Sequence, residues 1–323
     1  MPTKSKTPAP ISADLTVSDA FATIMDHNYR YLIQWEDTAK NWNDIEGVHQ
    51  FRVTIRRMRS ALSLFRTAIP KEASHHWSDE MRWLASELGL ARDLDVFIDE
   101  GLAHTARLPL DGAVRLKELA ESRRAKAYHE QVRPMLEGER YQHFKEAFPD
   151  WYEQHRWEEA EVKKKHRESL DMKVTPFARS LLDKQERRVL SAGSHVDRDN
   201  PAEMHRLRIE CKKLRYAAEF FRPIFAGMDT FISHMKGLQD LLGLMNDVAV
   251  MQGLLDELLA DENNHETLVY AGGLVGWRTC DFYHMLERLD GYWEEFTEAK
   301  HPWWKKAAVI ETAQQQSEVD IEV

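Results

Sequence analysis

The sequence predicts an all-α protein built as two four-helix bundles, and three observations support this fold class. Apolar residues recur at spacings of three and four along most long segments, which is the period of an amphipathic helix. No alternating run bounded by turn residues is found, so no strand is predicted. Blocks of sequence also repeat in the same order at an interval of about 155 residues, which indicates an internal duplication.

Four helices are expected in the first half of the chain. Ser18 or Asp19 is a suitable N-cap for the first helix, and Pro70 ends the second. Pro149 is expected to interrupt the chain after the fourth helix, because proline cannot donate a backbone hydrogen bond. The expected helices span residues 17–40, 46–70, 77–103 and 113–148.

Composition assigns the remaining segments. Residues 151–172 are highly charged and predict a solvated connector, while residues 1–14 and 308–323 are expected to be disordered tails. The first bundle is therefore assigned to residues 15–150 and the second to residues 173–307.

Two pairs of sequence blocks carry the repeat. The stretch "VHQFRVTIRRMRSALSLFR" at 48–66 aligns with "MHRLRIECKKLRYAAEFFR" at 204–222, an offset of 156 residues. The stretch "LGLARDLDV", which starts at Leu88, aligns with "LGLMNDVAV", which starts at Leu242, an offset of 154 residues. Because both pairs occur in the same order with nearly the same offset, chance is a poor explanation for them.

The first pair of blocks places positive charge along one side of a helix. On a helical wheel, the apolar residues between Phe51 and Phe65 form one face, and basic residues line up beside it. We call these rows the basic stripes. The first stripe consists of His49, Arg52, Arg56 and Arg59, and the second of His205, Arg208, Lys212 and Arg215. Arg57 and Lys213 lie off the stripes.

The distribution of charge predicts an anionic partner. The chain has a formal net charge of −10, yet residues 48–66 carry +5 and residues 204–222 carry +4, which leaves −19 on the rest. Like charges one turn apart destabilise a helix, and solvated helix faces usually mix acids with bases. An ordinary solvated face is the alternative reading, and it is weaker for two stripes than for one.

An aspartate follows the "LG" pair in each copy, at Asp93 and Asp247. Each could hold a stripe arginine in position, bind a metal ion that bridges to phosphate, or form a salt bridge within its own helix. The H-x-x-R spacing is not a metal-binding pattern, so the histidines are expected to donate to phosphate or to orient a neighbour. Arg82, Arg92 and Lys236 are assigned to the edge of the basic surface.

These residues resemble the CHAD domain, the conserved histidine α-helical domain. The shared pattern is H-x-x-R-x-x-x-[RK]-[RK]-x-R, found from His49 to Arg59 and from His205 to Arg215, with the "LG…D" block after each copy. The stretches "ERYQHF" at 139 and "HPWW" at 301 also resemble the family's pattern. Asn246 stands where the first copy has Arg92, so the two halves are not expected to contribute equally.

The resemblance covers roughly residues 15–307 and implies two four-helix bundles related by approximate two-fold symmetry, with both basic helices lining one groove. It also implies a non-catalytic module that binds inorganic polyphosphate at polyphosphate granules. No cofactor is implied, and divalent cations would enter only with the polyphosphate. The implied polyphosphate-binding residues are His49, Arg52, Arg56, Arg57, Arg59, His205, Arg208, Lys212, Lys213 and Arg215, with Arg82, Arg92, Arg140 and Lys236 at the edge.

Two other functions are considered. The stretch "EAEVK" at 159–163 resembles the signature of triphosphate tunnel hydrolases, which hold divalent metal with glutamates. In those enzymes the signature begins a strand of a β-barrel, whereas here a helical repeat follows, and Glu159 with Lys163 is an ordinary i,i+4 pair. RNA binding is the second alternative, and the acidic total charge and the lack of a base-reading module argue against it.

The remaining features concern the cellular setting. Cys211 and Cys280 form no CxxC pattern, which predicts a reducing compartment and no zinc cluster. No run of about 18 apolar residues and no secretory signal is visible, so a cytoplasmic protein without a membrane partner is expected. The sequence identifies no protein partner.

Overall fold

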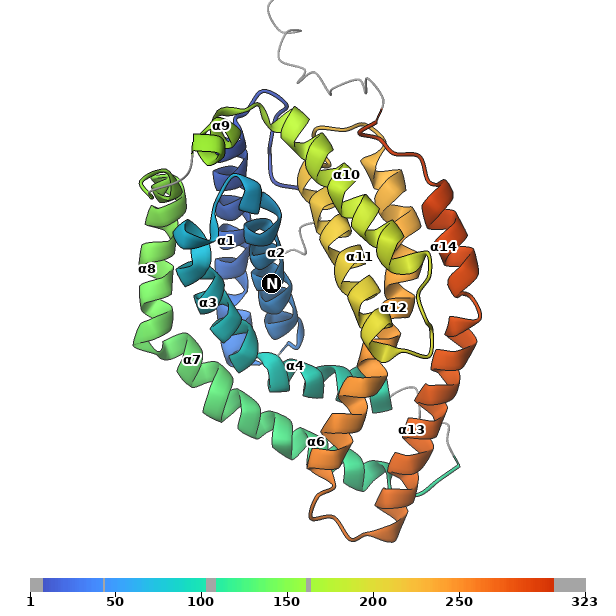
Figure 1. The fold of residues 1–323 in the computed structure, drawn as a ribbon. Helices are drawn as coiled ribbons and strands as arrows, with labels where there is room; N and C mark the ends of the chain where they lie inside the picture. The colour runs from blue at the N-terminus through green and yellow to red at the C-terminus, as the bar shows by residue number, and fades with distance from the viewer. Residues whose placement is uncertain (1–7, 43, 103–108, 161–163, 305–323) are drawn as a thin grey trace, which may run out of the picture.

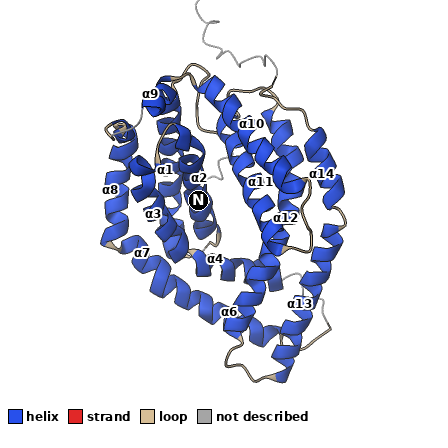
Figure 2. Ribbon diagram, viewed as in Figure 1, coloured by secondary structure: helices blue, strands red, loops and turns tan. Residues whose placement is uncertain are grey.

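The computed structural model describes residues 8–42, 44–102, 109–160 and 164–304, and within these ranges the regular elements are all helices (Figure 2). The first half contains α1 (Val17–Asn41), α2 (Glu46–Leu64), α3 (Lys71–Glu87), α4 (Gly89–Val96), α6 (Ala113–Ala127), α7 (Arg133–Glu137) and α8 (Glu139–Glu153). The second half contains α9 (Lys164–Asp171), α10 (Val174–Gly193), α11 (Pro201–Phe221), α12 (Met228–Leu258), α13 (His265–Leu286) and α14 (Leu289–Glu298). Short helical turns are η1 (Phe65–Thr67), η2 (Phe97–Gly101), η3 (Tyr128–Val132) and η4 (Arg156–Glu158). The all-α fold class is confirmed.

The helices form two groups that meet along the repeated segments. In Figure 1, α1, α2, α3 and α8 make one group, and α10, α11, α12 and α14 make the other. Contacts between the groups run from α2 to α11, from α4 to α12 and from α6 to α13. The helices that carry the two stripes, α2 and α11, are therefore neighbours in the fold.

Aromatic packing fixes α2 against the second half. The ring of Phe65 lies 5.1 Å from that of Phe177 on α10 and 5.9 Å from that of Phe221 on α11. All three side chains are buried, and Phe65 and Phe221 are the repeated pair at the ends of the two motif segments. Because closely packed cores resist small shifts, this contact holds the two stripes in a defined register.

The N-cap of α1 differs from the expectation. Neither Ser18 nor Asp19 caps the helix. Instead Thr16 occupies the N-cap position and its hydroxyl accepts a hydrogen bond from the Asp19 backbone N–H at 3.0 Å. Ser18 is buried in the first turn of the helix, and its hydroxyl accepts a hydrogen bond from the Trp157 indole N–H at 3.1 Å.

The expectation that Pro149 interrupts the chain is wrong, because Pro149 lies inside α8. A proline within a helix leaves the carbonyl four residues earlier without its N–H donor. That carbonyl belongs to Lys145, and the Tyr29 hydroxyl of α1 donates to it at 2.8 Å. A side chain from another helix therefore supplies the donor that the proline removed.

Two other expected helices are divided in the structure. The expected helix over 77–103 begins earlier, at Lys71, and is broken at Leu88 into α3 and α4, with the π-helical turn η2 after them. The expected helix over 113–148 contains the π-helical turn η3 and is interrupted at Gly138, whose extended backbone separates α7 from α8.

The connector and the first tail are more ordered than expected. Trp151, Tyr152 and Trp157 of the expected solvated connector are buried in the aromatic core. Ala9 and Ile11, which were assigned to a disordered tail, are also buried. The tail expected at 308–323 lies outside the described residues.

The described part of the chain holds no helix that is both long enough and apolar enough to span a bilayer.

Candidate functional site

The first stripe lies on the side of α2 that the core does not cover, with Arg56 exposed and its neighbours Arg52 and Arg59 half-buried. Phe51, Ile55 and Met58 are fully buried, which leaves the basic residues on the side that the core does not cover. Arg52 reaches the end of α3, where its guanidinium donates to the Ala85 carbonyl at 2.5 Å. Burial lowers the pKa of Arg52, and the charge of Arg56 lowers it further.

The second stripe lines a pocket between α11 and α12. Arg208, Lys212 and Arg215 project from α11, and Ser233 and Lys236 come from α12, around a volume of about 320 Å³. Gln239, Asp240, Ile232 and Leu242 complete the lining. Lys236, assigned from its alignment with Arg82, is therefore brought to the second stripe.

The two stripes converge. The positive charge of Arg56, on α2, lowers the pKa of both Arg208 and Lys212, on α11. Such repulsion between residues of different helices requires that they lie within a short electrostatic range of each other. We call the combined set the basic site. It consists of Arg52, Arg56, Arg59, Arg208, Lys212, Arg215 and Lys236.

Lys212 is the most strongly perturbed cation of the basic site. Burial, followed by the charges of Arg208, Arg56 and Arg215, lowers its pKa to about 7, while Asp247 acts in the opposite direction. The negative charge of a bound anion would offset the repulsion from these arginines. It would therefore stabilise the charged form of the Lys212 ammonium.

Some guanidinium groups of the second stripe have unused donors. The Nε atoms of Arg208 and Arg215 are buried and have no hydrogen-bond partner. A buried donor without an acceptor is costly, and native proteins usually supply a partner from the protein, water or a ligand. Two such atoms in one basic pocket indicate a place for an anion's oxygens.

Arg59 and Arg82 form the edge of the basic site in the first half. Burial lowers the pKa of Arg59, and the charge of Arg82 on α3 lowers it further. Arg82 also makes an ion pair with Asp79 at 2.6 Å. This places Arg82 beside the first stripe, as Lys236 lies beside the second.

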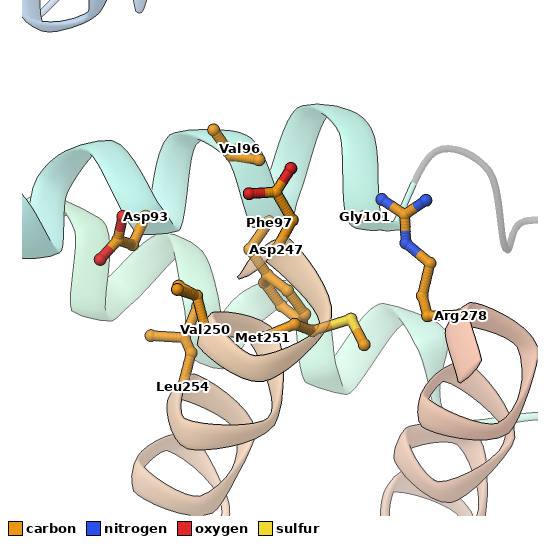
Figure 3. A pocket seen from close by; sticks show the side chains of 9 residues that line it. All are labelled: Asp93, Val96, Phe97, Gly101, Asp247, Val250, Met251, Leu254 and Arg278. Atoms are coloured by element: carbon orange, nitrogen blue, oxygen red, sulfur yellow. The ribbon is translucent and has the colours of Figure 1, made fainter. Parts of the chain in front are cut away.

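The two repeated aspartates line one pocket where α4 contacts α12. Asp93 and Asp247 line a small pocket of about 80 Å³ together with Arg278 of α13 (Figure 3). Burial raises the pKa of Asp93, the charges of Arg52 and Arg92 lower it, and Asp247 raises it. Asp247 in turn raises the pKa of Arg208. Each aspartate therefore favours the charged form of an arginine of its own half, which supports the positioning role among the three alternatives.

No cluster of three or more metal-ligating side chains occurs within the described part of the chain.

The residues that lie off the stripes are engaged elsewhere. Arg57 makes an ion pair with Glu219 of α11 at 3.6 Å, and Glu219 also accepts a hydrogen bond from Arg215 at 2.9 Å. Lys213 pairs with Glu210 at 2.7 Å. Arg57 therefore joins α2 to α11, while Lys213 is held by an acid of its own helix, and both are less available to an anion.

Arg140 and the two histidines lie at different places. Both guanidinium arms of Arg140 pair with Glu80 at 2.9 Å, and the group stacks over Trp83 at 4.0 Å. His49 is half-buried in the first turn of α2, and His205 is exposed in the first turn of α11. Each histidine therefore lies at the N-terminal end of its stripe.

The sequence reasoning missed several lining residues. Ser233 and Gln239 of α12 lie in the pocket of the second stripe, and the Ala85 carbonyl anchors Arg52. A serine or glutamine on a helix carries no pattern that separates it from an ordinary surface residue, and a backbone carbonyl carries none at all. These contacts follow only from the packing of α3 and α12 beside the stripes.

Comparisons with known proteins agree with this architecture. The CHAD domain family model matches residues 23–256. A crystal structure of the CHAD domain from the plant Ricinus communis is similar with a TM-score of 0.77 and 25% sequence identity, over 93% of this chain and 99% of that one. PptA from Streptomyces chartreusis has a similar fold, with a TM-score of 0.64 and 14% identity, over 87% of this chain and 100% of that one. No match was found among curated proteins.

Proposed function

Because this chain belongs to the CHAD domain family, we propose that it binds inorganic polyphosphate through the basic site. The observation that carries the proposal is the convergence of the stripes: α2 contacts α11, Arg57 pairs with Glu219 across them at 3.6 Å, and the charge of Arg56 lowers the pKa of Lys212. Cations gathered from two helices at this electrostatic cost are stabilised by a dense polyanion lying between them.

The chemistry of the basic site suits a chain of phosphates. Polyphosphate is a flexible linear polymer with about one negative charge per unit and no bases. Arginine presents a planar fork of donors that matches phosphate oxygens and does not deprotonate. The buried Nε atoms of Arg208 and Arg215 would gain acceptors in the complex. The Ser233 hydroxyl lines the same pocket, but its proton is donated to the Asp229 carbonyl at 3.0 Å.

Nucleic acid fits the site less well. Among the described residues that line the pocket of the second stripe, none is aromatic, so no ring is offered for base stacking. The rest of the chain carries −19, which repels a bulky polyanion while the basic site attracts a narrow one. We therefore propose polyphosphate as the ligand in preference to RNA.

We further propose that the protein is a binding module located at polyphosphate granules and that it does not hydrolyse its ligand. In the "EAEVK" stretch, residues 161–163 lie outside the described residues. Glu159, which is described, pairs with Arg156 at 3.3 Å. Purified protein with magnesium or manganese should release no phosphate from polyphosphate. Multiple turnover that is lost in Glu159→Ala would support the hydrolase alternative instead.

A binding titration tests the proposed ligand. Long-chain polyphosphate and single-stranded RNA would be compared at equal charge concentration and physiological salt, because both gain affinity from released counterions. We expect polyphosphate to bind at least about tenfold more tightly, since the arginine forks match its phosphate density. Equal or tighter binding of RNA would contradict the proposal.

A further inference from the structure

A second group of cations lies outside the basic site, along α10. Two adjoining pockets of about 470 Å³ and 520 Å³ share Lys184 and Arg188 in their linings. The first pocket adds Arg66 of η1, and the second adds Arg187 and Arg206. We call this group the α10 surface, and all of its cations are exposed.

The charges of the α10 surface are not neutralised by the protein. Within the described part of the chain, no ion pair with a carboxylate forms at Arg66, Lys184, Arg187, Arg188 or Arg206. Glu210, the acid in the lining, is paired with Lys213 at 2.7 Å.

The acids of α10 itself are engaged elsewhere. Asp183 accepts hydrogen bonds from the indoles of Trp303 and Trp304, and Glu186 contacts His301. Residues 301–304 thus contact the acidic side chains of α10, while Lys184, Arg187 and Arg188 of the same helix stay exposed to solvent.

The α10 surface is separate from the basic site. Around α11, Arg206 points about 140° away from the mean direction of the second stripe. The pockets of the α10 surface share no lining residue with the pocket of Arg208, Lys212 and Arg215.

The α10 surface is also not a product of the sequence repeat. The positions 156 residues before its cations on α10 and α11 are Asn28, Tyr31, Leu32 and Gln50, none of which is basic. A cationic surface present in only one half cannot be explained by the duplicated motif.

The chemistry of the α10 surface indicates phosphate oxygens as the ligand. Four of its cations are arginines, and the hydroxyls of Ser63, Thr67 and Ser180 add neutral donors. The Gln185 side chain, which lines the same pocket, is 5% exposed, and its Oε1 has no hydrogen-bond partner. From Ser180 to Ser191 the surface follows α10 for about 16 Å, which is long enough for several consecutive phosphates.

We propose that the α10 surface is a second phosphate-binding site, so that one protein molecule holds two segments of polyphosphate. This inference rests on the proposed function and extends it. With one segment in the basic site and another on the α10 surface, each molecule is bivalent toward the polymer. It can then link two separate polyphosphate chains. Alternatively it can hold one polyphosphate chain at two points, where the second contact is intramolecular and raises the overall affinity.

Three matched triple variants test the inference. The α10 variant is Lys184→Ala, Arg187→Ala and Arg188→Ala. The stripe variant is Arg208→Ala, Lys212→Ala and Arg215→Ala. The control variant is Lys164→Ala, Lys165→Ala and Arg167→Ala, which removes three exposed cations from α9. Calorimetric titration with tripolyphosphate counts the sites, and light scattering with long-chain polyphosphate reports linkage of chains.

We expect two binding events in the wild type and in the control variant. The α10 variant should lose the second event, with at least about tenfold weaker binding there, while the first keeps its affinity. The stripe variant should keep the second event. Scattering by long chains should fall in the α10 variant, because a molecule with one site cannot link two chains.

The possible failures are distinguishable. If the α10 variant shows the same number of sites and the same scattering as the wild type, the second site is overturned while the proposed function stands. The same holds if the control variant loses as much binding as the α10 variant, or if the α10 surface prefers single-stranded RNA to polyphosphate. If the wild type binds no polyphosphate, the proposed function itself fails.

Discussion

We predict that Lys212 couples the proposed polyphosphate binding to proton uptake. Its pKa is lowered to about 7 by burial and by the charges of Arg208, Arg56 and Arg215. A phosphate chain in the basic site would offset that repulsion and favour the charged ammonium. At pH 8 a group with a pKa of about 7 is only about one-tenth protonated, so binding should take up close to one proton.

The affinity should therefore fall as the pH rises above 7. Because one proton is taken up, the affinity can fall by at most about tenfold per pH unit. The fall should approach this limit between pH 8 and 9, and below pH 6 the affinity should no longer depend on this proton. Calorimetric titration at pH 8 in two buffers of different ionisation enthalpy measures the proton uptake directly. In Lys212→Arg the side chain is charged throughout, so this part of the uptake should disappear.

The histidines provide the necessary control. His49 and His205 remain in Lys212→Arg, so any uptake that they contribute persists in that variant. Lys164→Arg on the exposed face of α9 should leave the uptake at the wild-type value. Equal proton uptake in the wild type and in Lys212→Arg at pH 8 would refute the assignment of Lys212 to the phosphate contact.

Four further predictions concern the basic site and the fold. Arg56→Ala or Arg208→Ala should each weaken polyphosphate binding by about 1–3 kcal/mol, and Arg52→Lys should also lose affinity because the fork of donors is lost, all measured by titration at physiological salt. Glu219→Gln should strengthen binding by up to about 1 kcal/mol, since it removes the negative partner of Arg57 and Arg215; unchanged affinity would place Glu219 outside the field of the site. Lys212→Met should raise the melting temperature at pH 7 by roughly 2–4 °C, because it removes a lysine whose charged form is less stable in the folded protein than in the unfolded chain. Between pH 7 and 10.5 the folded lysine becomes neutral while the unfolded one stays charged, so the gain should shrink as the pH rises through that window. Tyr29→Phe should lower the free energy of unfolding by about 1–3 kcal/mol, since the Lys145 carbonyl above Pro149 loses its donor, and denaturant unfolding measures the loss.

The sequence predicted the part of the site that depends on one helix at a time. A helical period fixes which side chains share a face, so the stripes on α2 and α11 follow from spacing and sign alone. The repeat then indicated that two such helices belong together. Their convergence at Arg56, Arg208 and Lys212 is a tertiary feature that no local pattern contains.

The misplaced elements share a tertiary cause. Pro149 was expected to break the chain because a proline removes a donor, and the compensating Tyr29 hydroxyl lies on a helix far away in sequence. The aromatic residues Trp151 and Trp157 lie in a segment whose charge suggested solvent, yet they pack against Phe21 of α1. In both cases a distant partner decides the outcome.

The α10 surface was missed for the same reason. Its cations come from η1, α10 and α11, and η1 lies far before the two helices in the sequence. On α10 the acids Asp183 and Glu186 alternate with the cations, so the helix reads as a mixed solvated face. Around α10 the two acids and the three cations point about 120° apart, and the docking of Trp303 and His301 covers the acidic side.

The central claim is that both halves of the chain contribute to one polyphosphate site. Long-chain polyphosphate would be titrated at physiological salt into the wild type, into Arg52→Ala with Arg56→Ala and Arg59→Ala, and into Arg208→Ala with Lys212→Ala and Arg215→Ala. The account predicts that each triple variant loses at least about tenfold in affinity, because either stripe alone leaves half of the phosphates without a partner. Full affinity after removal of either stripe would contradict it.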